Sequence, residues 1–195
     1  MFNKQLFILV LLIGAVVSQP AGTLPGIQNG YLIMSSTTDY NAEHSVFNSK
    51  LNRPIRAWCP ATSVVGNNGE WIMASSITPF DVYGISIQGR YDYDQWVNLF
   101  QIQVSLDGFA WTTIGTYNSG LTDRNTVKYI DFGGVRRVRN VLLKPVTWHP
   151  NGIAVRWEVL MKIKLEIYDL LRLYDHVATR EAEYVIILSD TDYIT

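Results

Sequence analysis

The stretch DQWVNLFQIQVSLDGFAW, residues 94–111, shows most directly how this chain folds. Phe100, Ile102 and Val104 alternate with polar residues, which is the pattern of a strand with one buried face. Asp107 and Gly108 then form a dipeptide that favours a turn. The stretch therefore predicts a half-buried strand that ends in a tight turn.

Similar strand-length runs occur on both sides of this stretch. Residues 82–89 alternate in the same way, and residues 140–144 do so in part. Gly-Gly at 133–134 and Asn-Gly at 151–152 separate such runs, and no long helical periodicity occurs before residue 160. Short strands separated by turn residues predict an all-β fold, an antiparallel sandwich or barrel.

Length and composition limit the classes of function. The chain has 195 residues, 48% of them hydrophobic, which suits one domain with a substantial core. Its formal net charge of -1, without a long run of either sign, lacks the basic field that nucleic-acid binding requires. We therefore expect no nucleic-acid partner.

The N-terminus has the pattern of a secretory signal peptide. Lys4 is followed by an apolar run over residues 6–17 and then by the small residue Ser18. The run is shorter than the ~20 apolar residues of a membrane-spanning helix. We predict a signal peptide at 1–18, a lead-in segment at 19–30 and a secreted, extracellular protein; the alternative is a buried N-terminal helix.

Residues 161–195 differ in character from the rest of the chain. Ile163, Ile167, Leu170 and Leu171 have spacings that a helix could use, whereas 183–195 could form a strand. The segment is too short for an independent core. We expect this C-terminal extension to pack on the sandwich or to mediate self-association as a homo-oligomer.

Cys59 is the only cysteine, so it cannot form a disulfide within the chain. We expect a buried, unreactive thiol, with a bridge between chains as the alternative. The three histidines fall in different segments, and no nucleophile, zinc or phosphate-loop motif occurs. The sequence therefore predicts a protein that is not an enzyme.

Five motifs in register resemble the discoidin family, also called coagulation-factor 5/8 type C domains. They are EWIMASS at 70–76, GISIQGR at 84–90, the stretch at 94–111, GLTDRNTV at 120–127, and 135–160 with its Pro-x-Thr-Trp and Arg-x-Glu elements. Residues 36–52 and AWC at 57–59 are most similar to the lectin-like discoidins. The resemblance covers about residues 31–160.

The resemblance implies a jelly-roll antiparallel β-sandwich, as in galactose-binding domains, with ligands held by loops at one end. It also suggests that four tryptophans fill the core: Trp71, Trp96, Trp111 and Trp148. Arg139 and Arg156 lie in apolar strands, so we expect them to be buried and paired, with Glu158 or Asp123 as partners.

Some relatives hold a structural calcium ion, which needs about six to eight oxygen ligands. The Asp-Gly that helps to build that site is missing from NRPIRAWC at 52–59. Asn48, Asn52 and Glu158 alone are too few ligands. We expect no cofactor, with a structural Ca²⁺ as the open alternative.

Three loops match the ligand end of the family: 38–44, 51–58 and 90–95. A hexose has hydroxyls on its edge and C–H groups on one face, so it needs polar partners and an aromatic ring. We predict that the loops bind carbohydrate, a galactose-type sugar first, and that the site residues are Asp39, Tyr40, Asn41, His44, Arg90, Tyr91, Asp92 and Tyr93.

Two other ligands remain as alternatives, phospholipid headgroups and a protein in cell adhesion. Membrane insertion is disfavoured, because burying the carboxylates of these loops in the acyl layer costs more free energy than burying two tyrosines contributes. Some relatives have Arg-Gly-Asp where this chain has Arg90-Tyr91-Asp92. Tyrosine lacks the backbone freedom of that glycine, which weakens the integrin-like reading. A solvated loop without a ligand is the plain structural alternative.

Overall fold

The computed structural model describes residues 22–62 and 69–162, and this part of the chain is all-β apart from two 3₁₀ turns. The predicted signal peptide and the extension beyond Lys162 lie outside the described residues, so both stay predictions. Within the described ranges, no helix is long and apolar enough to span a membrane. The all-β prediction is confirmed.

The strands form one continuous antiparallel sheet, ordered β1-β7-β3-β6-β4-β5, with β2 paired to the free side of β3. The elements are β1 (Thr23–Pro25), β2 (Ile33–Ser36), η1 (Ala42–His44), η2 (Val46–Asn48), β3 (Ile72–Gln88), β4 (Val97–Ser105), β5 (Thr112–Asn118), β6 (Lys128–Trp148) and β7 (Arg156–Lys162).

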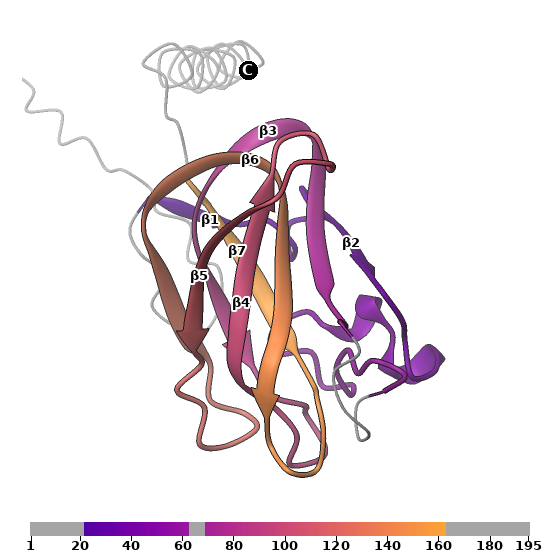
Figure 1. Cartoon of the computed structure of the whole chain (residues 1–195). Coiled ribbons are helices and arrows are strands. Elements are labelled where there is room, and N and C mark those ends of the chain that lie inside the picture. The colour runs from indigo at the N-terminus through magenta and orange to yellow at the C-terminus, as the bar shows by residue number, and fades with distance from the viewer. Residues whose placement is uncertain (1–21, 63–68, 163–195) are drawn as a thin grey trace, which may run out of the picture. The chain divides into compact units, whose positions relative to one another are not determined.

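Two long strands, β3 and β6, turn this sheet into two layers, and Figure 1 shows both arching over the top of the molecule. The first part of β3 pairs with the last part of β6, beside β4 and β2. The last part of β3 pairs with the first part of β6, beside β7. Register shifts in β3 between Ser75 and Phe80 and between Val82 and Gly84 allow the bend.

The core lies between the layers and follows the alternation seen in the sequence. Phe100 and Ile102 of β4 are fully buried, as are Ile72 of β3 and Leu143 of β6, which pair with each other. At roughly 25 cal/mol per Å² of apolar area, this continuous cluster is the main stabilising contribution.

The tryptophan prediction was right only in part: Trp96 and Trp148 pack against the core cluster, whereas Trp71 and Trp111 are not part of it. Trp58 and Trp157 are the fully buried indoles, whereas the four predicted core tryptophans, Trp71, Trp96, Trp111 and Trp148, are each partly exposed. Strand alternation explains Trp71: its neighbour Ile72 faces the core, so Trp71 must face outward.

The arginine prediction was right only for the burial of Arg156. Arg139 is exposed. Arg156 is buried, but it donates to backbone carbonyls rather than to Glu158 or Asp123. The carboxylate of Glu158 instead accepts from the amides of Ile27 and Gln28, which fastens the lead-in to β7.

Candidate functional site

The three predicted loops meet at one end of the sandwich, which we call the ligand end. Main-chain hydrogen bonds join them: Tyr40 N–H donates to Cys59 O over 2.8 Å, Cys59 N–H to His44 O over 3.0 Å, and Tyr91 N–H to Arg56 O over 3.1 Å. The structure therefore brings together segments that are up to 50 residues apart, as the sequence predicted.

Two arginines hold one carboxylate at the centre of this end. Asp92 accepts from Arg56 over 2.7 Å and from Arg90 over 2.6 Å. The hydrogen bond from Arg90 holds the pKa of Asp92 below its ordinary value, so the carboxylate is charged at neutral pH. We call Arg56, Arg90 and Asp92 the charged fork.

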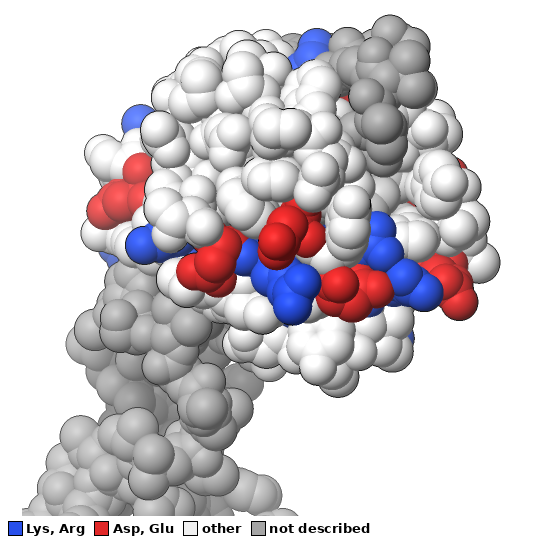
Figure 2. All heavy atoms as spheres, turned by 90° about the horizontal axis from the view of Figure 1, so that it is seen from below, with Lys and Arg blue, Asp and Glu red and all other residues white. Residues whose placement is uncertain are grey.

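The charged fork connects to further charges on both sides. Arg56 also pairs with Glu43 of the first loop at 3.1 Å. Arg124 lies 3.6 Å from Asp94. Figure 2, which views the molecule from below, shows acidic and basic side chains alternating in one band. Such a band offers donors and acceptors side by side at the surface.

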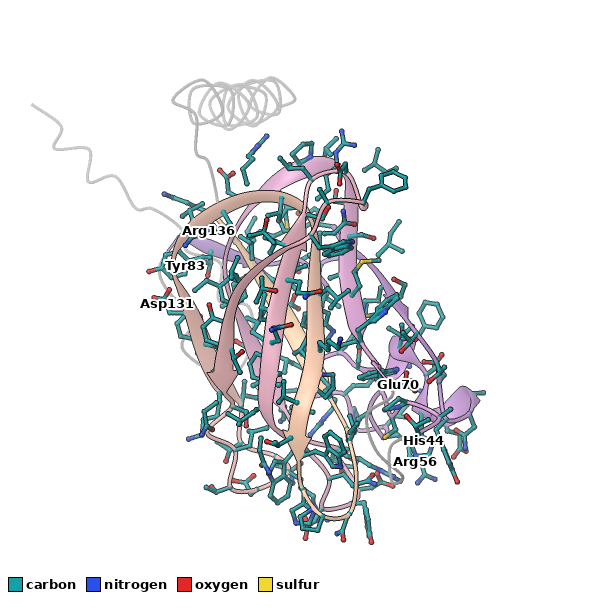
Figure 3. All side chains as sticks on the ribbon, in the orientation of Figure 1. His44, Arg56, Glu70, Tyr83, Asp131 and Arg136 are labelled. Atoms are coloured by element: carbon teal, nitrogen blue, oxygen red, sulfur yellow. The ribbon has the colours of Figure 1, made fainter. Side chains whose placement is uncertain are left out.

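His44 lies beside the charged fork and is only 6% exposed. Its Nδ1 is 2.7 Å from Asn41 Oδ1, and its Nε2 is buried without a hydrogen-bond partner among the described residues. Burial and then the positive charges of Arg90 and Arg56 lower the pKa of His44. The imidazole is therefore neutral at pH 7. Figure 3 shows His44 next to Arg56.

Three tyrosine rings surround these polar groups. Tyr40 is 58% exposed and meets the His44 ring edge-on at 5.4 Å. Tyr91 is 44% exposed and lies 5.8 Å from the guanidinium of Arg156, and Tyr93 is 49% exposed over Arg90 at 5.6 Å. Each ring thus has a fixed position and a free face.

Two of the predicted site residues mainly support the loops. Asn41 caps η1, because its Oδ1 accepts from Glu43 N–H and His44 N–H. Asp39 Oδ1 accepts from Ser36 Oγ over 2.8 Å and from Val46 N–H over 3.2 Å. The other six, Tyr40, His44, Arg90, Tyr91, Asp92 and Tyr93, form or border the charged fork.

Sequence reasoning missed Arg56, although it named the loop that contains it. Arg56 has a φ of 38°, a left-handed conformation that side chains other than glycine rarely adopt. This strained backbone conformation lies at the centre of the ligand end, and strained residues tend to cluster at functional sites. No signal in the sequence could have revealed it.

For Arg156, sequence reasoning named the wrong hydrogen-bond partners. This buried arginine anchors the loops of the ligand end. Its guanidinium donates to Gly89 O at 2.6 Å, Arg124 O at 3.0 Å and Arg53 O at 3.1 Å. Those carbonyls belong to three different loops, between β3 and β4, between β5 and β6, and between η2 and β3. Burial lowers the pKa of Arg156 to about 10, so it stays charged at neutral pH.

Cys59 is buried beneath the loops, as expected of an unreactive thiol. Burial raises its pKa to about 12, so little thiolate exists at neutral pH. Within the described ranges, no group of three His, Cys, Asp or Glu side chains could hold a metal ion. Glu158, one of the calcium candidates, is committed to backbone amides.

Residues 33–159 match the F5/8 type C domain family. The chain belongs to the discoidin family. It is 34% identical over 158 residues to Discoidin-2 of Dictyostelium discoideum, a match that covers 73% of this chain and 59% of that protein. The chain thus spans a little over half the length of this relative.

Solved structures agree with the family assignment. The wild-type discoidin II of Dictyostelium discoideum has a TM-score of 0.68 at 32% identity, covering 75% of this chain and 61% of that chain. The family 32 carbohydrate-binding module of C. perfringens NanJ, solved with galactose, has a TM-score of 0.58 at 11% identity, covering 71% of this chain and 98% of that module. The predicted β-sandwich and the family resemblance are confirmed.

Proposed function

We propose that this discoidin domain is a non-catalytic carbohydrate-binding module whose site is the ligand end, with galactose-type sugars as the first candidate. One observation carries the proposal: a charged fork shared by two loops, and linked to the first loop through Glu43, lies among three half-exposed tyrosines. The similarity to the discoidins and to the galactose-bound module supports it.

The geometry suits a hexose for two reasons. Arg56, Arg90 and Asp92 present charged donors and acceptors that bind vicinal hydroxyls in pairs. The free faces of Tyr40, Tyr91 and Tyr93 can cover the apolar C–H face of a ring.

Retention on an immobilised galactose column, with elution by free galactose, tests this proposal. Arg56→Ala should abolish retention. Its matched control is Arg137→Ala, because Arg137 is also an exposed arginine paired with one aspartate, Asp81 at 3.2 Å, but it lies away from the loops. Retention should survive in that control. Equal behaviour of the two variants would contradict the assignment of the site.

Lipid headgroups remain the second candidate, because Ile55 beside Arg56 is 45% exposed. Burying one such side chain in a bilayer contributes about 1.5–3 kcal/mol. Asp94 and Glu43, which are exposed at the same end, would oppose insertion. Co-sedimentation with phosphatidylserine vesicles without retention on the sugar column would favour this second candidate.

We further propose that the protein acts outside the cell, from the predicted signal peptide at 1–18. Mass spectrometry of protein from the culture medium should find an N-terminus near Gln19. Finding the intact Met1 form only inside cells would contradict export.

A further inference from the structure

The outer face of the sandwich carries a hollow, away from the ligand end. It has a volume of about 420 Å³ and crosses three neighbouring strands, β3, β6 and β4. We call it the face groove. Its lining includes Trp71, Met73, Gln103, Trp111, Leu142 and Lys144.

The register of the sheet explains why these side chains meet. Gln103 of β4 pairs with Leu142 of β6, and Leu142 pairs with Met73 of β3, so one row crosses the face. Lys144 lies two residues beyond Leu142 on β6, and Trp71 lies two residues before Met73, directly ahead of β3, so both belong to the same face. The row is therefore a fixed feature of the sheet and not of a loop.

Two indoles border the face groove. Trp71 and Trp111 are both partly exposed, and Trp111 is fixed because its Nε1–H donates to Gly108 O over 3.1 Å. Leu142 between them is nearly buried and forms an apolar floor. Partly exposed aromatic faces over an apolar floor can stack against the C–H side of a ring.

Two polar side chains of the lining, Gln103 and Lys144, can still form a hydrogen bond or an ion pair with a ligand. Gln103 Nε2 donates to Gln101 Oε1 over 3.2 Å and to Thr113 Oγ1 over 3.1 Å, which leaves Gln103 Oε1 free to accept. Lys144 is the one charged residue in the lining, and it has no salt bridge to any residue that the structure describes. The local charge therefore favours an anionic group.

The size of the face groove argues for a small ligand and against a protein partner. Its volume lies within the ~300–1,000 Å³ range of small-ligand sites. A stable protein interface buries about 800 Å² on each partner and has a broad apolar core. The aliphatic side chains in the lining of the face groove are those of Met73 and Leu142, which are too few for such a core.

We propose that the face groove is a second saccharide site, which binds sugar rings that carry a carboxylate. The rings stack against Trp71 and Trp111, and the carboxylate pairs with Lys144. This site is separate from the ligand end, since Gln103 is six residues along β4 from Val97, where the strand leaves the loops, about 20 Å at ~3.3 Å per residue. It does not depend on the function proposed for the ligand end.

Trigalacturonic acid is a suitable probe, and its methyl ester is the matched neutral control. In ¹H–¹⁵N spectra of the full chain, the acid should shift the indole N–H signals of Trp71 and Trp111. The signals of the buried Trp58 and Trp157 should stay in place. The ester should bind about tenfold more weakly, because it cannot form the charged pair with Lys144.

Lys144→Gln should weaken binding of the acid about tenfold and leave binding of the ester unchanged. Lys128→Gln changes the same residue type on the same strand outside the groove, and it should have no effect. Asp92→Asn should leave the indole shifts intact, which separates this site from the ligand end. Shifts confined to loop residues, equal affinities for acid and ester, equal effects of the two lysine variants, or no shift at millimolar acid would each overturn the proposal.

Discussion

Arg156→Met would remove the side chain that holds three connections of the ligand end together. Three backbone carbonyls, those of Gly89, Arg124 and Arg53, would lose their donor. An unsatisfied buried polar group costs about 1–3 kcal/mol, so the gross loss is about 3–9 kcal/mol.

One favourable change offsets part of this loss. Burial lowers the pKa of Arg156 to about 10, so the folded protein carries a desolvation cost for this charge. At about 1.4 kcal/mol per pKa unit, the cost is on the order of 3 kcal/mol, and the methionine variant no longer carries it. The free energy of unfolding should therefore fall by about 3 kcal/mol.

Urea denaturation followed by tryptophan fluorescence measures this change. With a slope of about 1–3 kcal/mol per molar urea, the midpoint should fall by about 1–3 M. Hydrogen exchange at the Tyr91 amide, which donates to Arg56 O, should become faster, because the loops lose their anchor. Retention on galactose should fall with it.

Arg139→Met is the matched control, since Arg139 is exposed on β6. It should change stability by less than about 0.5 kcal/mol. If Arg156→Met also cost less than about 1 kcal/mol and left exchange at Tyr91 unchanged, the carbonyl anchor would have no energetic role, and the reasoning would be refuted.

Two further predictions concern stability and pH. Burial raises the pKa of Glu158 to about 7. The contribution of this group to stability is therefore fully present below its unfolded pKa near 4.5 and is lost as pH rises through 7. Urea midpoints at pH 5 and pH 8 should show this loss in the wild type and not in Glu158→Gln. Because Arg56 has a φ of 38°, Arg56→Gly should be more stable than Arg56→Ala by about 1 kcal/mol, although both lose their salt bridges and galactose retention; equal melting temperatures would show that the left-handed backbone carries no strain.

The fold could be predicted because its signals are local. Phe100 and Ile102 alternate with polar residues, and they are buried as that alternation requires. The same rule could have placed Trp71 outward, since it precedes the inward Ile72. The family resemblance suggested a core position for Trp71, but the face of a strand that a residue occupies follows from its place in the alternation.

The candidate site could be predicted only in part. The three loops and six of the eight named residues converge on the charged fork, because polar and aromatic residues were concentrated in loops. Arg56 and Arg156 could not be assigned, because their partners lie 13–103 residues away in sequence. A carbonyl acceptor exists at every residue, so the sequence does not show which ones a buried arginine will choose.

The pairing of β1 with β7 has a consequence for protein engineering. Thr23 and Lys162 are direct partners, so the entry and exit of the sandwich lie side by side. A short linker could join them, and new termini could open in the exposed turn at 106–110. Such a circular permutant would keep every strand pairing. Because Lys162 is six residues from Arg156 along β7, Thr23 and Lys162 both lie about 20 Å from the ligand loops, at ~3.3 Å per residue. The domain could therefore be spliced into a surface loop of a host protein with its ligand end still facing solvent.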